Sequence, residues 1–397
     1  MRLGILPREK ISRLKGKSSI WLHTVSVGEA QAAAGLIKGL KQRYRDFNLV
    51  ISTVTRTGNR IAQKLVEAQD LVIYLPLDIG PILRGVIRRI NPRVFIVAET
   101  EIWPNLINNL NREDVSVALV NGRVSQGSYR GYRLIRPFFK RIIRGINLFC
   151  MQTEPDAQRI ISLGADSNRV KVTGNMKFDI AGSEFTAESS QLGLREDEQL
   201  FIAGSTHPGE EEIILQVYEQ LLGQYPGLRL LLAPRHTQRT KEIEKLVSRS
   251  GFSSERISRV SSAMNNQLRI KNPILILDTI GQLKPLYELA DLVFIGGSLV
   301  KRGGQNPIEP AVFSKAIIFG PYMDNFLQIS RAFLQQRAAI MVRNRSQLKQ
   351  ACIKLLSDSD LRQRQGRRAK KIIEEHKGAT SRNLELITGL INKGRNI

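Results

Sequence analysis

Short apolar runs alternate with longer amphipathic segments along most of the chain. In the first half we expect strands at residues 20–25, 49–53, 71–75, 94–98, 115–120, 148–152 and 170–172. Apolar positions at helical spacing lie between most of these runs, at residues 29–44, 58–66, 80–89, 103–110 and 155–163. Buried strands that alternate with helices indicate βαβ units and therefore a parallel sheet.

The same alternation begins again after a polar stretch, residues 178–198, which we interpret as a linker. Strands are expected at 200–203, 228–233, 274–277, 292–295, 316–319 and 339–342, and helices at 210–222, 240–250, 282–289, 306–313, 348–356, 361–376 and 380–391. The sequence thus predicts two Rossmann-like α/β domains, residues 1–177 and 199–397, facing across a cleft. Such sheets bind ligands beyond the carboxyl ends of their strands, so we expect functional residues in the loops there.

Carboxylates follow two of the strands expected in the first domain. Glu29 lies in SVGE after the first strand, and Glu99 and Glu101 lie in AETEIWPN after the fourth. Like charges in a partly dry site raise each other's pKa, and such a group suits proton transfer. In the alternative interpretation, Glu29 only caps a helix and interacts with its dipole, while the other two side chains are solvated.

The second domain carries groups that suit an anion. The Ser205 and Thr206 hydroxyls and the main-chain N–H groups near them can hold an anion before the next helix, although a plain capped helix explains this stretch equally well. Arg235 and His236 follow a very apolar strand, where an arginine suits a phosphate partner. The stretch GGSLVKRGGQNPIEP combines glycines with a helix start, and its Glu309 suits ribose hydroxyls; a flexible surface loop is the alternative.

The charge of the chain is strongly positive, +24 from 60 Lys and Arg against 36 Asp and Glu. This balance suits a polyanionic partner. Residues 115–153 contain no acid, and apolar residues recur there at i, i+3 and i+4. That pattern is typical of a basic amphipathic helix at an anionic membrane surface, or of a core helix with a solvated basic face. The expected membrane contacts are Arg133, Arg136, Phe138, Phe139, Lys140 and Arg144.

Several other function classes fit the sequence less well. Aromatic residues make up only 6% of the chain and do not interleave with the basic ones, which disfavours a nucleic-acid-binding module. Neither a P-loop nor a GxGxxG after a strand occurs, which disfavours an NTPase or a dinucleotide enzyme. The four histidines lack the spacing of a zinc site. We expect neither a metal nor a cofactor. No apolar run approaches 18 residues.

Six segments, SVGE, ETEIWPN, GNMKFD, GSTHPGEE, APRH and GGQNPIEP, occur in this order. In these segments and their order the chain resembles the 3-deoxy-D-manno-octulosonic acid (Kdo) transferases of lipopolysaccharide assembly, over nearly its whole length. The resemblance implies a GT-B fold, a lipid A precursor in the N-terminal domain, CMP-Kdo in the C-terminal domain, and a place at the cytoplasmic face of the bacterial inner membrane. Many members begin with an apolar membrane anchor, so we expect that this chain either lacks the anchor or is an incomplete version.

The resemblance also implies roles for individual residues. Glu29 matches the general base, and Glu99 and Lys177 match supporting positions at the transition state. The segments that contact CMP correspond to Arg235, His236, Ile280, Gly281, Gln282, Asn306, Pro307, Ile308 and Glu309. Direct displacement would invert the anomeric centre. The alternative function is a GT-B glycosyltransferase or epimerase that uses a UDP-sugar.

Overall fold

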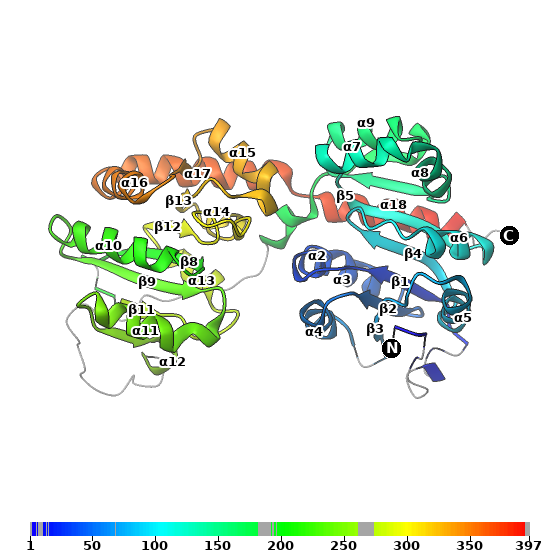
Figure 1. Ribbon diagram of the computed structural model, residues 1–397, viewed down its shortest axis with the longest axis horizontal. Coiled ribbons are helices and arrows are strands. Elements are labelled where there is room, and N and C mark those ends of the chain that lie inside the picture. The colour runs from blue at the N-terminus through cyan, green and yellow to red at the C-terminus, as the bar shows by residue number, and fades with distance from the viewer. Residues whose placement is uncertain are drawn as a thin grey trace. The chain divides into compact units, whose positions relative to one another are not determined.

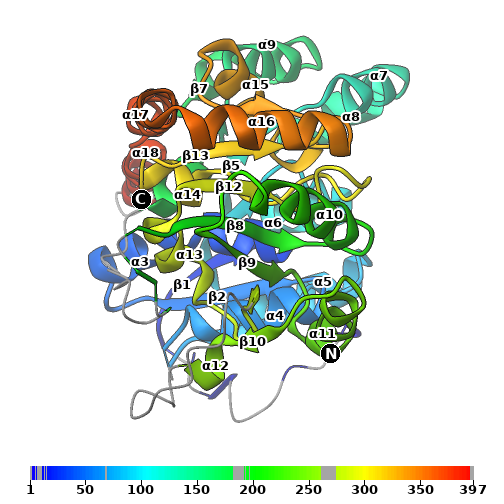
Figure 2. The same ribbon diagram turned by 90° about the vertical axis from the view of Figure 1, so that its left-hand side faces the viewer.

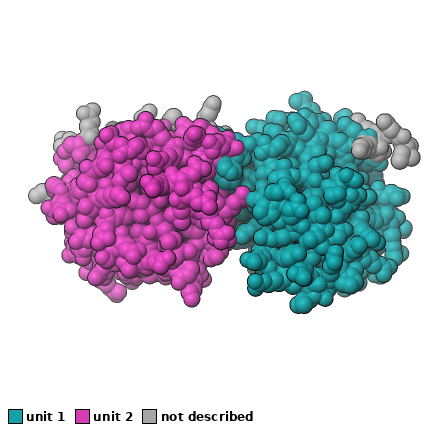
Figure 3. Space-filling view, turned by 90° about the horizontal axis from the view of Figure 1, so that it is seen from above, with its two compact units in different colours: residues 1–182, 376–397 teal, residues 183–375 magenta. Residues whose placement is uncertain are grey.

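The computed structural model describes residues 2–4, 6, 11–12, 14, 16–67, 69–181, 192, 194–195, 197–260 and 274–393. The chain forms two compact units (Figure 3). Unit 1 comprises Met1–Gly182 together with His376–Ile397, and unit 2 comprises Ser183–Glu375. The chain therefore leaves unit 1 once and comes back to it near its end.

Unit 1 is built on a parallel sheet of seven strands in the order β3-β2-β1-β4-β5-β6-β7 (Figure 1). The strands are β1 Ser19–His23, β2 Asn48–Thr53, β3 Leu71–Tyr74, β4 Pro92–Ala98, β5 Ser116–Gly122, β6 Leu148–Met151 and β7 Val170–Val172. The helices are α2 Val27–Ala32, α3 Ala34–Arg43, α4 Arg56–Lys64, α5 Gly80–Ile90, α6 Pro104–Arg112, α7 Gln126–Leu134, α8 Arg136–Ile143, α9 Glu154–Ser162 and α18 Ala379–Lys393, with 3₁₀ turns η1 Ser167–Arg169 and η2 Met176–Ala181.

Apolar side chains cover both faces of this sheet. Along β1, Trp21 belongs to one apolar cluster, while its neighbours Ile20 and Leu22 belong to the other. This follows from the pleat, which sends successive side chains of a strand to opposite faces. Helices α5, α6, α8 and α9 supply the first cluster, and α3, α4 and α18 supply the second. The strands are consequently buried on both sides, as their continuous apolar runs predicted.

Unit 2 repeats this plan with the strand order β10-β11-β9-β8-β12-β13-β14 (Figures 1 and 2). Its strands are β8 Gln199–Thr206, β9 Leu228–Pro234, β10 Ser254–Arg256, β11 Ile274–Ile276, β12 Leu292–Ile295, β13 Ala316–Phe319 and β14 Ile340–Met341. Its helices are α10 Glu210–Leu222, α11 Thr240–Arg249, α12 Ile257–Val260, α13 Leu283–Leu286, α14 Ile308–Val312, α15 Leu327–Gln335, α16 Arg345–Ser357 and α17 Ser359–His376, with 3₁₀ turns η4 Thr237–Arg239, η5 Tyr287–Leu289 and η6 Asp324–Phe326. Helices α10, α11 and α16 pack their apolar residues into one cluster with the sheet.

The predicted fold class, two Rossmann-like α/β domains, is confirmed, but the end of the chain was assigned to the wrong domain. Residues 376–397 belong to unit 1, because Ile387 and Ile391 of α18 are buried in the apolar cluster on one face of the first sheet. The expected linker also begins later than predicted, since residues 178–181 form part of η2 within unit 1. Most of its remainder, residues 182–191, 193 and 196, lies outside the described residues.

Candidate functional site

In both sheets the strand order reverses beside the first strand. Strand β1 lies between β2 and β4 in unit 1, and β8 lies between β9 and β12 in unit 2. Loops that leave the carboxyl ends of neighbouring strands diverge at such a point, and ligands of open α/β sheets bind there. Glu29 follows β1 and Glu99 follows β4. The predicted carboxylates of the first domain therefore flank the reversal point of its sheet.

Glu29 is held in the first turn of α2 by its own loop. The Val25 N–H donates to Glu29 Oε2 at 2.7 Å, and the Ser26 hydroxyl donates to Oε1 at 2.9 Å. The Glu29 N–H donates back to Ser26 Oγ at 3.3 Å, which caps the helix. Burial raises the pKa of Glu29, and the charges of Glu99 and Glu101 raise it further, against the lowering effect of the two hydrogen bonds. Glu29 is therefore part of the helix cap and also provides a carboxylate that is held in place and has a raised pKa.

Glu99 pairs with the lysine that the family resemblance indicated. Lys177 Nζ lies 3.3 Å from Glu99 Oε1, and the two side chains are 18% and 28% exposed. Glu99 has a left-handed backbone, with φ of 58°, and its N–H donates to Val120 O at 2.8 Å. Such a conformation costs free energy in a residue other than glycine and is common at functional sites. The turn after β4 thereby directs Glu99 toward η2.

The position of Lys177 depends on a residue that the sequence analysis missed. The Met176 N–H donates to Asn121 Oδ1 at 3.0 Å, and the Lys177 N–H donates to Asn175 Oδ1 at 2.9 Å. Asn121 is buried at the end of β5, with φ of 53°. The available signal was an asparagine that interrupts an apolar strand directly before a glycine. The end of β5 therefore holds η2 next to the carboxylates.

Glu101 is the third carboxylate of this group. Its pKa is raised by burial and then by the charge of Glu99. Burial and the charge of Glu101 in turn raise the pKa of Tyr132 on α7. Glu29, Glu99 and Glu101 hence influence one another electrostatically, as the sequence predicted for like charges at one sheet edge.

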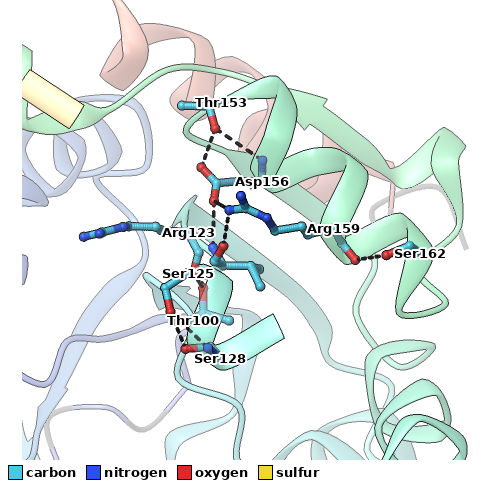
Figure 4. A network of polar contacts seen from close by, with 9 residues as sticks. Thr100, Arg123, Ser125, Ser128, Thr153, Asp156, Arg159 and Ser162 are labelled. Carbon is cyan, nitrogen blue, oxygen red and sulfur yellow. Dashed lines mark hydrogen bonds and ion pairs between the residues drawn. The ribbon is translucent and has the colours of Figure 1, made fainter. Parts of the chain in front are cut away.

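A hydrogen-bonded network ties together the loops that follow β4, β5 and β6 (Figure 4). Asp156 Oδ1 accepts from the Val124 N–H at 2.9 Å, and the Thr153 hydroxyl donates to Asp156 Oδ2 at 2.5 Å. The Thr100 hydroxyl donates to the Arg123 carbonyl, and the backbone N–H of Arg123 donates to Thr100 Oγ1 at 3.1 Å. The Arg123 side chain points away from this network (Figure 4). Because Thr100 follows Glu99 directly, the network also fixes the turn that carries this carboxylate.

In unit 2 a buried carboxylate organises the loop after β12. Glu210 Oε2 accepts from the N–H groups of Gly297 at 2.6 Å and His207 at 2.9 Å, and Oε1 accepts from Ser298 and Leu299, both at 3.0 Å. Burial raises the pKa of Glu210, and these four N–H groups lower it. These four amides therefore have acceptors within the protein, including the amide of His207, which lies in the segment where the sequence predicted an anion site.

Thr206 does not have the predicted role of an anion-binding hydroxyl. The residue is fully buried, and its hydroxyl donates to Glu211 Oε1 at 2.8 Å. The same oxygen lies 2.8 Å from Arg239 Nη1, so Glu211 joins β8 to the segment after β9. Ser205 is half-buried, with φ of 56°, and its predicted ligand contact stays a prediction.

Arg235 and His236 are exposed at the end of β9, beside a histidine that the predictions did not include. The rings of His207 and His236 meet edge-to-face with centroids 5.9 Å apart, and His207 Nε2 lies 3.2 Å from Gln305 Nε2. Burial lowers the pKa of His207 to about 4, aided by the charges of His236, Arg302 and other arginines. A neutral His207 accepts the Gln305 amide hydrogen at Nε2, so cations and a fixed imidazole surround this strand end.

The start of α14 is organised by its own side chains. The Ile308 N–H donates to Asn306 Oδ1 at 3.0 Å, and Asn306 Nδ2 donates to Glu309 Oε1 at 3.2 Å. Burial raises the pKa of Glu309, whereas Asn306, Lys284 and Arg235 lower it. Pro307 and Ile308 are buried, so their side chains support the loop and are not available to contact a nucleotide.

Ile280, Gly281 and Gln282 precede α13 and are all exposed, with Ile280 at 83%. Gly281 has φ of 92°, which glycine adopts without strain. The Gln282 side-chain oxygen accepts from the Thr279 hydroxyl. The predicted contacts of these three residues with CMP stay a prediction.

The expected basic amphipathic helix is two helices, α7 and α8, which meet at Ile135. Leu134, Ile135 and Phe138 are exposed at 87%, 49% and 58%. Phe139 is buried and stacks on Tyr132 at 4.2 Å, so the prediction that Phe139 contacts a membrane is wrong. The side chain turns inward because the helix must bury one face on the core. In the described part of the chain, no helix has the length and apolarity that a membrane crossing requires.

Of the predicted basic contacts, Arg133, Arg136 and Arg144 are exposed, while Lys140 is only partly exposed. The aliphatic part of Lys140 lies against Gly164, where an added Cβ would come within 2.5 Å of it. We therefore define the α7–α8 patch as Arg133, Leu134, Ile135, Arg136, Phe138 and Arg144.

Solved structures share the whole fold. The UDP-GlcNAc 2-epimerase from Neisseria meningitidis bound to UDP-GlcNAc aligns with a TM-score of 0.60 at 12% identity, over 94% of this chain and all (100%) of that chain. A glycosyltransferase from Rickettsia africae ESF-5 aligns with a TM-score of 0.60 at 14% identity, over 95% of this chain and 99% of that one. Together they establish a fold of the GT-B type, as predicted.

A family model described as 3-Deoxy-D-manno-octulosonic-acid transferase (kdotransferase) matches residues 1–180. The 3-deoxy-D-manno-octulosonic acid transferase of Haemophilus influenzae is 34% identical over 373 residues, 93% of this chain and 86% of that protein. The chain belongs to the Kdo transferase family. A bifunctional glycosyltransferase/methyltransferase of Fusobacterium nucleatum is also 34% identical, over 342 residues that make up 85% of this chain. The chain spans about half of that relative, which it covers to 52%.

Members of the Kdo transferase family are glycosyltransferases, so this chain is an enzyme of that class. Sequence reasoning on this Kdo transferase found the groups that follow strand ends. It missed the groups that hold those loops, which are buried Asn121, Glu210 and Glu211 and half-buried His207 and Gln305. The sequence does contain a signal for Glu210 and Glu211, because three acids follow one another in the first turn of α10.

Proposed function

We propose that this protein transfers Kdo from CMP-Kdo to a lipid A precursor, lipid IVA, in lipopolysaccharide biosynthesis. Transfer inverts the anomeric centre, and Glu29 is the general base. Family membership supports the Kdo transfer. The observation that supports the base is the Glu29 carboxylate at the reversal point of the first sheet, oriented by two hydrogen bonds and with a pKa raised by burial.

In the proposed reaction, the acceptor hydroxyl loses its proton to Glu29 as its oxygen attacks the anomeric carbon of Kdo. A base whose pKa lies nearer to neutral is more effective in this step, which explains the use of a half-buried carboxylate. Lys177 pairs with Glu99, so its ammonium offsets part of the negative charge beside Glu29. CMP leaves with its phosphate, whose growing negative charge Arg235 stabilises. The proposal assigns no step to a metal ion or a cofactor.

The function is tested by incubating the protein with CMP-Kdo and a tetraacylated lipid A precursor, followed by mass spectrometry of the lipid. A mass increase of one or more Kdo residues is the expected result. A protein that turns over a UDP-sugar and leaves CMP-Kdo untouched would instead be the sugar-nucleotide enzyme considered as the alternative. A salt-sensitive shift of DNA without any transfer would point to nucleic-acid binding.

Replacing Glu309 by Ala should weaken CMP binding more than it slows transfer at saturating donor. The carboxylate is partly buried and is held by Asn306 at the start of α14, where it can accept hydrogen bonds from ribose hydroxyls. Hydrogen bonds to a charged group contribute about 1.5–3 kcal/mol, equivalent to about 10- to 100-fold in Kd. Titration calorimetry with CMP measures this effect.

The control for this experiment is Glu212→Ala, which removes an exposed carboxylate of the same unit. Its CMP affinity should equal that of the wild type. If Glu309→Ala also binds CMP with unchanged affinity, the start of α14 is not part of the nucleotide site.

We also propose that the α7–α8 patch holds the protein peripherally on the cytoplasmic face of the inner membrane. Exposed Arg133 and Arg136 neighbour exposed Leu134 and Phe138 in the sequence, a combination that suits an anionic interface. Each basic side chain near such a surface contributes about 1 kcal/mol. The purified protein should therefore co-sediment with vesicles that contain anionic lipid and remain in the supernatant with neutral ones.

A triple variant with Glu in place of Arg133, Arg136 and Arg144 should no longer co-sediment with these vesicles at moderate salt. It should also transfer less Kdo to membrane-embedded lipid. Transfer to a detergent-dispersed acceptor should persist, since Glu29 is unchanged. The matched control places Glu at three exposed arginines of unit 2, Arg331, Arg343 and Arg368, and changes the net charge of the protein by the same amount. Equal loss of binding in both triple variants would show that total charge, and not the α7–α8 patch, determines membrane binding.

A further inference from the structure

Two distant segments of the chain meet within unit 1, next to the proposed catalytic residues. One is η2, which contains Lys177 and after which the chain leaves unit 1 at Gly182. The other is the start of α18, which follows the return of the chain at His376. Two hydrogen bonds join these segments, and their partners are 199 and 201 positions apart in the sequence.

Asp179 forms the central contact between the two segments. Its Oδ1 accepts from the Gly378 N–H at 2.7 Å, and its Oδ2 accepts from the Thr380 N–H at 2.6 Å. The first N–H groups of a helix have no partner within the helix, and the helix dipole favours a negative charge there. One carboxylate of η2 therefore caps α18 with both of its oxygens.

Two further contacts reinforce this junction. Buried Phe178 stacks on the His376 ring with centroids 4.8 Å apart. The Arg382 Nε–H donates to Thr173 O at 2.8 Å. The backbone on both sides of Lys177 is thus attached to the start of α18, whose Ala379 is buried in the same apolar cluster as Met176.

We propose that Asp179 is a positioning residue: by holding η2 against the start of α18, it keeps the Lys177 ammonium beside Glu99. Only one residue separates Asp179 from Lys177, and a 3₁₀ turn couples their backbones closely. Asn121 holds η2 just before Lys177 through the Met176 N–H, and Asp179 holds it just after Lys177. This inference rests on the proposed function, because it matters for catalysis only if Lys177 and Glu99 act in the transfer.

The consequence for the site is electrostatic as well as geometric. The negative charge of Glu99 raises the pKa of Glu29. An ammonium 3.3 Å from Glu99 offsets part of that charge. When η2 is released and Lys177 moves away, less of the Glu99 charge is compensated, so the pKa of Glu29 should rise. A contact that only stabilises the fold would not change this pKa.

The test compares Asp179→Ala with the control Asp358→Ala. Asp358 accepts the Leu361 N–H at 2.8 Å near the start of α17, so its loss also removes a helix-capping carboxylate, but in unit 2. We expect Asp179→Ala to lower kcat about 10- to 100-fold, the size expected for a small displacement of a catalytic group, and to move the acidic limb of the pH–rate profile to higher pH. Asp358→Ala should leave both unchanged.

A second readout does not depend on activity. The rate at which an amine-reactive ester acylates Lys177, measured by peptide mass spectrometry, should increase in Asp179→Ala and not in Asp358→Ala. If the Ala variant does not fold, Asp179→Asn replaces it: its amide oxygen can accept from only one of the two N–H groups, and a smaller change in the same direction is expected.

The outcomes separate the inference from the proposed function. If Lys177→Ala keeps full activity while Asp179→Ala accelerates labelling of Lys177, Asp179 positions Lys177 but the proposed catalytic role fails. If Lys177→Ala is impaired while Asp179→Ala labels and reacts like the wild type, the inference is overturned. In the expected case, adding Asp179→Ala to Lys177→Ala causes little further loss, because both changes remove the same interaction.

Discussion

Replacing Glu29 by Gln should reduce kcat for Kdo transfer about 10²–10⁴-fold, because an amide cannot accept the proton of the acceptor hydroxyl. The amide can still accept from the Val25 N–H and donate to Ser26 Oγ, so the loop after β1 should keep its conformation. CMP-Kdo binding, which we assign to unit 2, should remain at the wild-type level. Single-turnover kinetics together with calorimetry separate the two effects.

The pH dependence provides an internal control for this prediction. The wild-type rate should rise with pH as Glu29 loses its proton, above its ordinary pKa of 4.5 because burial raises the pKa. The variant should lack this limb. A variant that keeps more than half of the wild-type rate would exclude Glu29 as the base.

The raised pKa of Glu29 also makes the stability of the protein depend on pH. The folded protein binds the Glu29 proton more tightly than the unfolded chain, since folding raises this pKa. The contribution of the residue to stability is therefore greatest at low pH and decreases as pH rises through the interval between the unfolded and folded pKa. At neutral pH, Glu29→Gln should have a free energy of unfolding in urea no lower than that of the wild type.

Replacing Glu210 by Gln should destabilise unit 2 by about 2–6 kcal/mol, because two buried N–H groups lose their acceptor at about 1–3 kcal/mol each. The wild-type carboxylate uses one oxygen for Gly297 and His207 and the other for Ser298 and Leu299. An amide can serve only one of these pairs and places its own N–H₂ group against the other. Urea unfolding measures the change.

Glu212→Gln is the matched control for this prediction, since Glu212 lies in the same first turn of α10 but is exposed. Its stability should change by less than about 0.5 kcal/mol, as for most surface substitutions. In Glu210→Gln the loop after β12 should also lose order, so CMP binding should weaken together with stability. A variant as stable as the control would show that the four amides find other partners.

The sequence by itself determined the features that depend on local pattern. Continuous apolar runs identified the buried strands, and helical spacing between them gave the crossovers, so the parallel sheets followed. The carboxyl end of each strand could then be located to within a few residues, which placed Glu29, Glu99 and Glu101 at one edge of the first sheet. Capping residues such as Ser26 are equally local, because a helix start needs an acceptor within three residues.

Only the tertiary structure decided the contacts between residues far apart in the chain. Asn121 with Met176, Glu210 with Gly297, and Asp179 with Gly378 are pairs that no local period encodes. Each depends on which strands become neighbours and on where the chain returns, and α18 returns to the first sheet because its apolar face is buried there.

Burial on amphipathic helices was likewise decided by tertiary packing. Phe138 and Phe139 are adjacent and chemically identical, yet one is 58% exposed and the other stacks on Tyr132 within the core. A periodic pattern gives the direction of the apolar face only to within a residue or so, and the break between α7 and α8 at Ile135 shifts that direction. The sequence therefore determined that a basic, apolar surface segment exists, and packing against the sheet decided which of its side chains remain on the surface.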